Sequence, residues 1–376
     1  MNINTYLRRF GRYTLREKPF NEIDALILSE LAYVNFQLVA PSIDESKAKP
    51  FRLKKLVVDD PLAFYRGSVD AIQNRTMVKL MMKSRRFKDL KIGFCENVFE
   101  KKTINQFFAM TIFLPTGEAF VAFRGTDTSL LGWKEDFYFA FEEAILAQVE
   151  ALEYIERMSS FLPERFYIGG HSKGGNLAMY AALHMSEGLQ ERLIRAYSFD
   201  GPGFQKSVAC LPRFEAVLPK LSKYITKNDI IGMLFNVMPA TKIVYSTGLM
   251  FGGHDPFYWQ LEKDRPAFRT VTDTSKSSKR NAKVMMEWLA SMSDEDKKLL
   301  IRFLFQVFEQ RENVYELIVF GFADLIQIPK VLRSYSQEDR RKIKTMLLAL
   351  KDFYFDSFRR GKRILEAKEK AKEKQS

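Results

Sequence analysis

Short apolar runs alternate with longer amphipathic segments over most of the chain. Helical patterns fill the longer intervals, and a turn at 115–117 (Pro-Thr-Gly) separates two of the apolar runs, which indicates a β-hairpin. Such alternation predicts a mainly parallel sheet with helices on both faces. The runs typical of β-strands lie at 91–99, 106–114, 119–124, 166–170, 194–199, 223–226 and 242–247.

The helical patterns are clearest in four segments. Residues 21–35 place apolar side chains near helical spacing, with Asn21 as the expected N-cap. A basic helical stretch lies within 61–90, an acidic one spans 134–160, and one rich in Ala and Met spans 175–187. These intervals supply the helices that would cover the sheet.

The pattern changes near residue 276. Ser293 and Ser336 each precede an Asp at the third helical position, which is typical of a capping box that opens a helix. We therefore expect two regions. Residues 1–275 would hold the sheet and an N-terminal helical extension, and residues 276–376 would form an all-helical region with a basic tail.

Composition and charge narrow the class of protein. With 46% hydrophobic and 28% charged residues, the chain is globular, and its net charge of +13 favours anionic surfaces. No nucleic-acid-binding motif is present, so no nucleic-acid partner is expected. The tail at 359–376 is interpreted as a solvated helix end, with peripheral contact with an anionic membrane as the alternative. Without an export signal or a membrane-spanning segment, the expected location is the cytoplasm, with the inner membrane surface as a peripheral site.

Cysteine and histidine are scarce. Cys95 and Cys210 are too few for a disulfide framework or a Cys-based zinc site. The three histidines have no spacing that would pair two of them on one helix as metal ligands. We therefore expect neither a metal nor a cofactor.

The segment 166–182, FYIGGHSKGGNLAMYAA, joins a predicted strand to a predicted helix. Within it, residues 170–174 fit the pattern G-x-S-x-G, with Ser172 at a sharp strand-to-helix turn. Side chains at Gly170 and Gly174 would collide in such a turn. The Ser172 hydroxyl would stand above the sheet, at the positive end of the helix. The sequence thus predicts a nucleophile elbow, and the alternative is a Gly-rich turn without chemistry.

A serine nucleophile needs a base. His171 adjoins Ser172 and would point away from it, and His184 lies twelve residues down the predicted helix. Elimination leaves His254, in a Gly- and Pro-containing loop after the last predicted strand. We interpret His254 as the base and the other two histidines as structural.

The acid that orients the base should lie between the serine and the histidine in the chain. Asp229 follows a predicted strand and is favoured. Asp200 also follows a strand and stays as the alternative acid, although its expected role is to tie down the turn at 200–203.

These residues carry a resemblance. Residues 119–137 (AFVAFRGTDTSLLGWKEDF) and 170–178 (GHSKGGNLA) resemble the class 3, or fungal-type, lipases of the α/β-hydrolase superfamily. Residues 21–36 (NEIDALILSELAYVNF) are similar to the bacterial Mbeg-like branch of that group. The likeness spans about residues 20–260. It implies an α/β-hydrolase fold, to which the helical region after residue 275 would be an appendage.

Carried over to this chain, the resemblance implies Ser172 as nucleophile, Asp229 as acid and His254 as base. It also implies that the backbone amides of Thr126 and Lys173 form an oxyanion hole, with the Thr126 hydroxyl as a further donor. Segment 127–137 lies where such lipases keep a lid, and the sequence does not decide whether it moves.

Two residues depart from the lipase pattern. Lys173 replaces the apolar residue usual after the nucleophile, and its side chain would either favour an anionic substrate or point to solvent. Asp200 opens a turn that differs from the lipase one, which keeps it open as the acid.

The function expected from these features is a serine hydrolase that cleaves a carboxylic ester, of lipid or acyl type, through an acyl-enzyme on Ser172. The alternative is a catalytically silent protein of the same fold that binds a membrane or a protein partner through basic surfaces.

Overall fold

The computed structural model describes residues 1–38, 49–57, 60–65, 70–127, 130–139, 142–204, 211, 213–235, 240–248, 250–307 and 327–353. The chain divides into two compact units, Met1–Thr274 and Ser275–Ser376, and each is described by itself.

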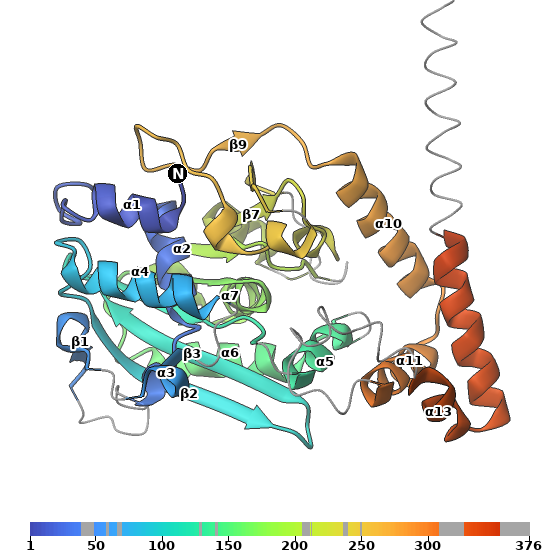
Figure 1. The fold of residues 1–376 in the computed structure, drawn as a ribbon. Helices are drawn as coiled ribbons and strands as arrows, with labels where there is room; N and C mark the ends of the chain where they lie inside the picture. The colour runs from blue at the N-terminus through green and yellow to red at the C-terminus, as the bar shows by residue number, and fades with distance from the viewer. Residues whose placement is uncertain are drawn as a thin grey trace, which may run out of the picture. The chain divides into compact units, whose positions relative to one another are not determined.

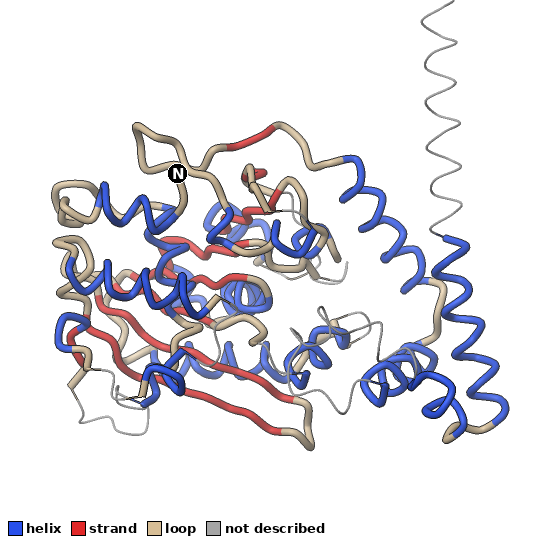
Figure 2. Tube along the Cα trace, in the orientation of Figure 1, coloured by secondary structure: helices blue, strands red, loops and turns tan. Residues whose placement is uncertain are grey.

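A sheet runs through the first unit (Figures 1 and 2). It has nine strands, which lie in chain order. The strands from β4 to β8 pair in parallel, and the other four pairings are antiparallel. The sheet is therefore mixed, and the prediction of a mainly parallel sheet is wrong in this respect. The nine strands are β1 (Phe51–Arg52), β2 (Lys91–Glu100), β3 (Asn105–Phe113), β4 (Ala119–Phe123), β5 (Phe166–His171), β6 (Leu193–Phe199), β7 (Leu221–Thr226), β8 (Lys242–Val244) and β9 (Thr270–Val271).

The antiparallel part follows from short connections. Only a few residues join β2 to β3 and β3 to β4, and such short links cannot make the crossover that a parallel pair needs. The second link contains Gly117 with a φ of 110°, which only Gly adopts without strain. β2 also carries a bulge, where its register against β3 shifts between Gly93 and Glu96.

Helices cover both faces of the sheet, and two apolar cores lie between them and the strands. Along β4, Phe120 and Ala122 face the first core, and Val121 and Phe123 face the second, as the period of a strand requires. The first core is closed by α1 (Ile3–Phe10), α2 (Glu22–Leu31), α3 (Pro61–Tyr65) and α4 (Ala71–Lys83), and the second by α6 (Leu146–Met158), α7 (Lys173–His184), α8 (Glu187–Arg192) and α9 (Phe214–Val217).

One helical prediction needs correction. The acidic segment 134–160 forms two helices, α5 (Leu130–Tyr138) and α6, instead of one long helix. The second of them starts afresh after Ile145, whose backbone N–H donates to Gln148 Oε1. Capping at this point ends any continuity between the two helices.

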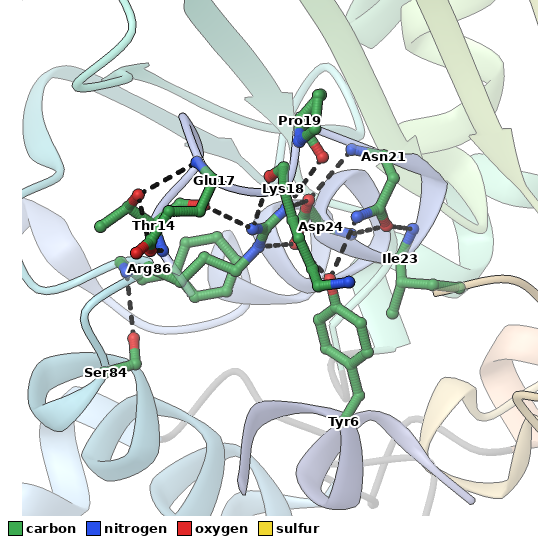
Figure 3. Close-up of polar contacts among 11 residues, drawn as sticks. Tyr6, Thr14, Glu17, Lys18, Pro19, Asn21, Ile23, Asp24, Ser84 and Arg86 are labelled. Carbon is green, nitrogen blue, oxygen red and sulfur yellow. Dashed lines mark hydrogen bonds and ion pairs between the residues drawn. The ribbon is translucent and has the colours of Figure 1, made fainter. Parts of the chain in front are cut away.

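A buried polar cluster joins the N-terminal helices (Figure 3). Arg86, in the loop after α4, forms an ion pair with Asp24 of α2, and both side chains are almost fully buried. The Tyr6 hydroxyl of α1 donates to Asp24 Oδ1 over 2.9 Å, and Arg86 Nη1 donates to the carbonyl of Lys18 over 2.8 Å. The cluster therefore ties three segments of the first unit together through satisfied charges.

The second unit is helical where it is described, with α10 (Lys276–Ala290), α11 (Asp294–Val307), α13 (Ile328–Arg333) and a helix at 337–353. The amide of Asp296 donates to the Ser293 hydroxyl, and that of Asp339 donates to the Ser336 hydroxyl, so both serines cap their helices as expected. In each case the Asp carboxylate accepts from the serine hydroxyl, which differs from the reciprocal backbone bond of a full capping box. The predicted basic tail at 359–376 lies outside the described residues. Among the residues that are described, no helix is long and apolar enough to cross a membrane.

Candidate active site

The structure places Ser172 between the end of β5 and the start of α7. Its backbone has φ 56° and ψ −130°, a conformation that non-Gly residues rarely adopt. The Ser172 amide donates to the carbonyl of Phe199 on β6, and the Ser172 carbonyl accepts from the amide of Gly175. These bonds hold a strained turn of the kind that clusters at functional sites.

Two glycines make the turn sterically feasible. A Cβ at Gly170 would collide with the backbone of Gly174, and a Cβ at Gly174 would collide with the carbonyl of Phe123 at the end of β4. The tight approach of the two glycines therefore brings α7, β4 and β5 together at Ser172.

Three predicted residues meet at the ends of the parallel strands. His254 Nδ1 lies 2.9 Å from Asp200 Oδ2 and 3.4 Å from Asp229 Oδ2. Asp200 follows β6 and Asp229 follows β7, and both carboxylates are buried. The two candidate acids thus contact one imidazole nitrogen, and the shorter distance is to Asp200.

The role expected for Asp200 in its own turn needs correction. Its carboxylate accepts from the Thr226 amide over 3.2 Å and from the Thr226 hydroxyl over 3.4 Å. Asp200 is thereby tied to β7 and to His254. Asp229 is fixed in turn by the amide of Ile231, which donates to its Oδ2 over 2.7 Å.

The charges at this junction shift one another. Burial raises the pKa of Asp200 to about 6, and the neighbouring charge of Asp229 adds to the rise. Burial opposes ionisation of Asp229 too, but His254, the Ile231 amide and the hydrogen bond with Asp200 together outweigh it, so the pKa of Asp229 lies below its usual value. For His254, burial favours the neutral ring, yet the two carboxylates outweigh burial and raise its pKa to about 10.

His171 braces the loop that carries His254. Its Nε2 donates to the backbone carbonyl of His254 over 2.9 Å, and its ring centroid lies 4.6 Å from that of His254. The other nitrogen, Nδ1, lies 3.1 Å from the Tyr33 hydroxyl and 3.4 Å from Glu30 Oε1. Burial holds the pKa of His171 well below its usual value, so the ring is neutral. His254 thus packs against the ring of the residue that directly precedes Ser172.

Both residues implied as oxyanion-hole donors have engaged side chains. The Thr126 hydroxyl donates to Asp136 Oδ2 over 2.6 Å, so in this state its proton is already used. Lys173 is buried, with Nζ 2.6 Å from Glu135 Oε2. The expectation that Lys173 points to solvent or attracts an anionic substrate is therefore wrong, because its charge is neutralised inside the protein.

Sequence reasoning missed the acidic partners of these two residues. Glu135 and Asp136 lie in the WKEDF segment of α5, where Glu135 is buried and Asp136 is half-buried. Two adjacent acidic residues between Trp133 and Phe137 were the signal that the sequence offered. Tyr33 and Glu30 were missed as well, since they belong to what reads as an ordinary amphipathic helix.

Among the described residues, the three that meet at this junction also have a geometry that would suit a metal ion. Ligand atoms of Asp200, Asp229 and His254 lie within 4.8 Å of one another. Each of these residues already has a hydrogen-bond partner within the protein, which accounts for the grouping without an ion.

Comparisons with known proteins give weak likenesses to solved lipase structures and a match to one family. No curated protein matches the chain. Among solved structures, M37 lipase is 14% identical with a TM-score of 0.35, over 56% of this chain and 68% of that chain. A native Rhizomucor miehei lipase propeptide complex is 17% identical with a TM-score of 0.30, over 53% of this chain and 66% of that chain. The sequence model of the Mbeg1-like family matches residues 81–306, more than half of the chain, and the protein therefore belongs to the Mbeg1-like family.

Proposed function

We propose that this protein is a serine hydrolase that cleaves a carboxylic ester of lipid or acyl type. The observation that carries the proposal is the strained Ser172 at the end of β5, beside an imidazole that is held by two buried carboxylates. A non-Gly residue held in this backbone conformation costs about 1–3 kcal/mol, and such strain clusters at functional sites. A nucleophile elbow accounts for the cost.

In the proposed reaction, His254 Nε2 takes the proton of the Ser172 hydroxyl while the oxygen attacks the ester carbonyl. The backbone amides of Thr126 and Lys173 would donate to the oxyanion, and each such donor can contribute about 3–4 kcal/mol of transition-state stabilisation. The alcohol leaves with the proton from His254, and water then hydrolyses the acyl-enzyme with His254 as base.

The orienting acid is best assigned to a pair. Asp229 stays in the role favoured from the sequence, and Asp200 joins it, because His254 Nδ1 makes its shorter contact with Asp200. Two carboxylates on one imidazolium stabilise the charge that forms during attack. They also keep the ring in one tautomer, with its proton on Nδ1.

A fluorophosphonate probe tests the proposal, because it reacts with an activated serine whatever the acyl group of the substrate. We expect the wild-type protein to be labelled and Ser172→Ala to be inert. Ser198→Ala, which removes a buried hydroxyl from the neighbouring strand β6, is the matched control and should be labelled like wild type.

Absence of labelling in the wild type, across neutral and alkaline pH, would favour the catalytically silent alternative. If labelling is found, esters of graded acyl length would then define the substrate class.

A further inference from the structure

The side chain of Lys173 is directed away from the proposed reaction and into the protein. Its Nζ lies 2.6 Å from Glu135 Oε2, 2.9 Å from the carbonyl of Gln106 and 3.4 Å from Gln106 Oε1. An ammonium group has three protons, so these three acceptors satisfy it. Lys173 therefore links the elbow to α5 and to β3.

Glu135 completes the link from the side of α5. Its Oε2 also accepts from the amide of Gln106 over 3.3 Å, and its side chain is almost fully buried. Breaking such a pair on one side leaves an uncompensated charge inside the protein, which is strongly destabilising. The contact is therefore unlike an exposed ion pair, which water can replace at little cost.

Close packing joins the same elements. A Cβ at Gly132 of α5 would collide with Gln106 Oε1 of β3 and would lie 2.8 Å from Thr126 Cγ2. Helix α5 thus lies directly against the residue whose amide is proposed as one oxyanion donor. Through Lys173, it is bound to the residue that carries the other.

We propose that the buried Lys173–Glu135 ion pair positions the oxyanion-hole amides and makes α5 a fixed wall of the site instead of a displaceable lid. This inference rests on the proposed function, because it assigns a role to the hole of the same site. Lys173 and Glu135 are positioning residues here: their side chains act through the backbone of 126 and 173. Opening α5 would expose both charges, so substrate must reach Ser172 without that movement.

The experiment compares two variants that neutralise the acid of a buried ion pair without changing its shape. Glu135→Gln acts on the pair at the site. Asp24→Asn acts on the Arg86–Asp24 pair between the N-terminal helices, and it is the matched control for lost stability. Two readouts are measured on the full chain: the inactivation kinetics of the fluorophosphonate probe, and hydrogen exchange of the α5 amides with and without anionic vesicles.

For Glu135→Gln we expect the inactivation rate constant to fall about 10- to 100-fold, the range that small misplacements of catalytic groups cause, with probe affinity unchanged. Exchange in α5 should rise at the same time. For Asp24→Asn the rate constant per folded molecule and α5 exchange should match wild type. In the wild type, α5 should stay protected when vesicles are added.

Three outcomes would overturn the inference. They are an unchanged rate constant in Glu135→Gln, an equal fall in both variants, and a loss of α5 protection in the wild type on adding vesicles. If the wild type is never labelled, the proposed function fails, while the exchange data still decide whether the ion pair fixes α5. Should Glu135→Gln not fold, Lys173→Arg keeps the charge and tests the same contact by its altered geometry.

Discussion

His254 lies against two buried carboxylates, and this arrangement sets how the site should respond to pH. The base must be neutral to accept the Ser172 proton, but the carboxylates raise the pKa of His254 to about 10. The neutral fraction therefore grows as pH rises through the neutral and alkaline range. Probe labelling should also increase as pH rises, because a larger fraction of His254 is then neutral and able to act as the base.

Replacing the acids separates their contributions. In Asp200→Asn and in Asp229→Asn one raising charge is lost, so the pKa of His254 falls and the rise of labelling with pH should begin at lower pH. Each single variant keeps one carboxylate on Nδ1. The double variant should lose about 10⁴-fold in inactivation rate, the loss that follows when a serine triad loses its orienting acid.

The measurement is a pH profile of the inactivation rate for the wild type and the three variants. If one single variant loses as much as the double variant, that residue alone orients His254, and the assignment to a pair is wrong.

At the scale of elements, α2 supports the elbow from the face opposite α7. Glu30 lies near the end of α2, and its buried carboxyl group contacts His171. Burial, with the nearby charge of Asp255, raises the pKa of Glu30 well above its usual value. The folded protein therefore keeps a proton on Glu30 at pH values where the unfolded chain has released it.

The raised pKa of Glu30 fixes the direction in which stability changes with pH. Above about pH 4.5 the unfolded state binds fewer protons at Glu30 than the folded state, so stability falls as pH rises, by about 1.4 kcal/mol per unit until the folded pKa is reached. Glu30→Gln cannot ionise and removes this loss. In denaturant unfolding at about pH 5, 6 and 7, the free energy of unfolding of Glu30→Gln should increase relative to that of the wild type at each step.

Glu17 supplies the opposite control. The Thr14 amide donates to its carboxylate and lowers the pKa of Glu17, so folding favours its charged form. Glu17→Gln should therefore show no gain with rising pH. A constant difference between Glu30→Gln and the wild type would mean that Glu30 is charged in the folded state.

The elements differed in how far the sequence could predict them. All seven predicted strands are present, with ends within three residues, because buried strands such as β4 read as unbroken apolar runs. The strands β1 and β9 were missed, since two residues give no period. The split between α5 and α6 was missed because both flanking segments keep helical spacing.

At the site, the glycine pattern and the scarcity of histidine pointed to Ser172 and His254. The choice between Asp200 and Asp229 stayed open because both follow a strand that ends at the same edge. The contact between Lys173 and Glu135 could not be predicted, since the two residues are 38 positions apart and only the folded sheet brings them together.

For the whole molecule, every residue of the proposed site lies in the unit Met1–Thr274. The assignment of that unit as the hydrolase domain, and of the rest as an appendage, stays a prediction. The family match runs past the boundary to residue 306, into α11. Whether the second unit is needed for the chemistry is therefore a question for truncation.

A chain that ends at residue 275 should fold and be labelled at Ser172 at the rate of the full protein, because each unit has its own apolar core. The measurements are cooperative unfolding and the inactivation rate of the truncated chain. A truncated chain that folds but reacts slowly would show that residues after 275 take part in the site.

The bulge in β2 has a consequence for how copies of this protein meet in concentrated solution. Between Gly93 and Glu96 the strand is out of step with a regular ladder, and Phe94 has a φ of 54°. On the side away from β3, the described residues pair β2 with β1 only at Lys91 and Ile92. A second sheet that approached the rest of β2 on that side would find donors and acceptors that are unevenly spaced, which disfavours pairing. The irregularity thus acts against self-association into fibrous aggregates.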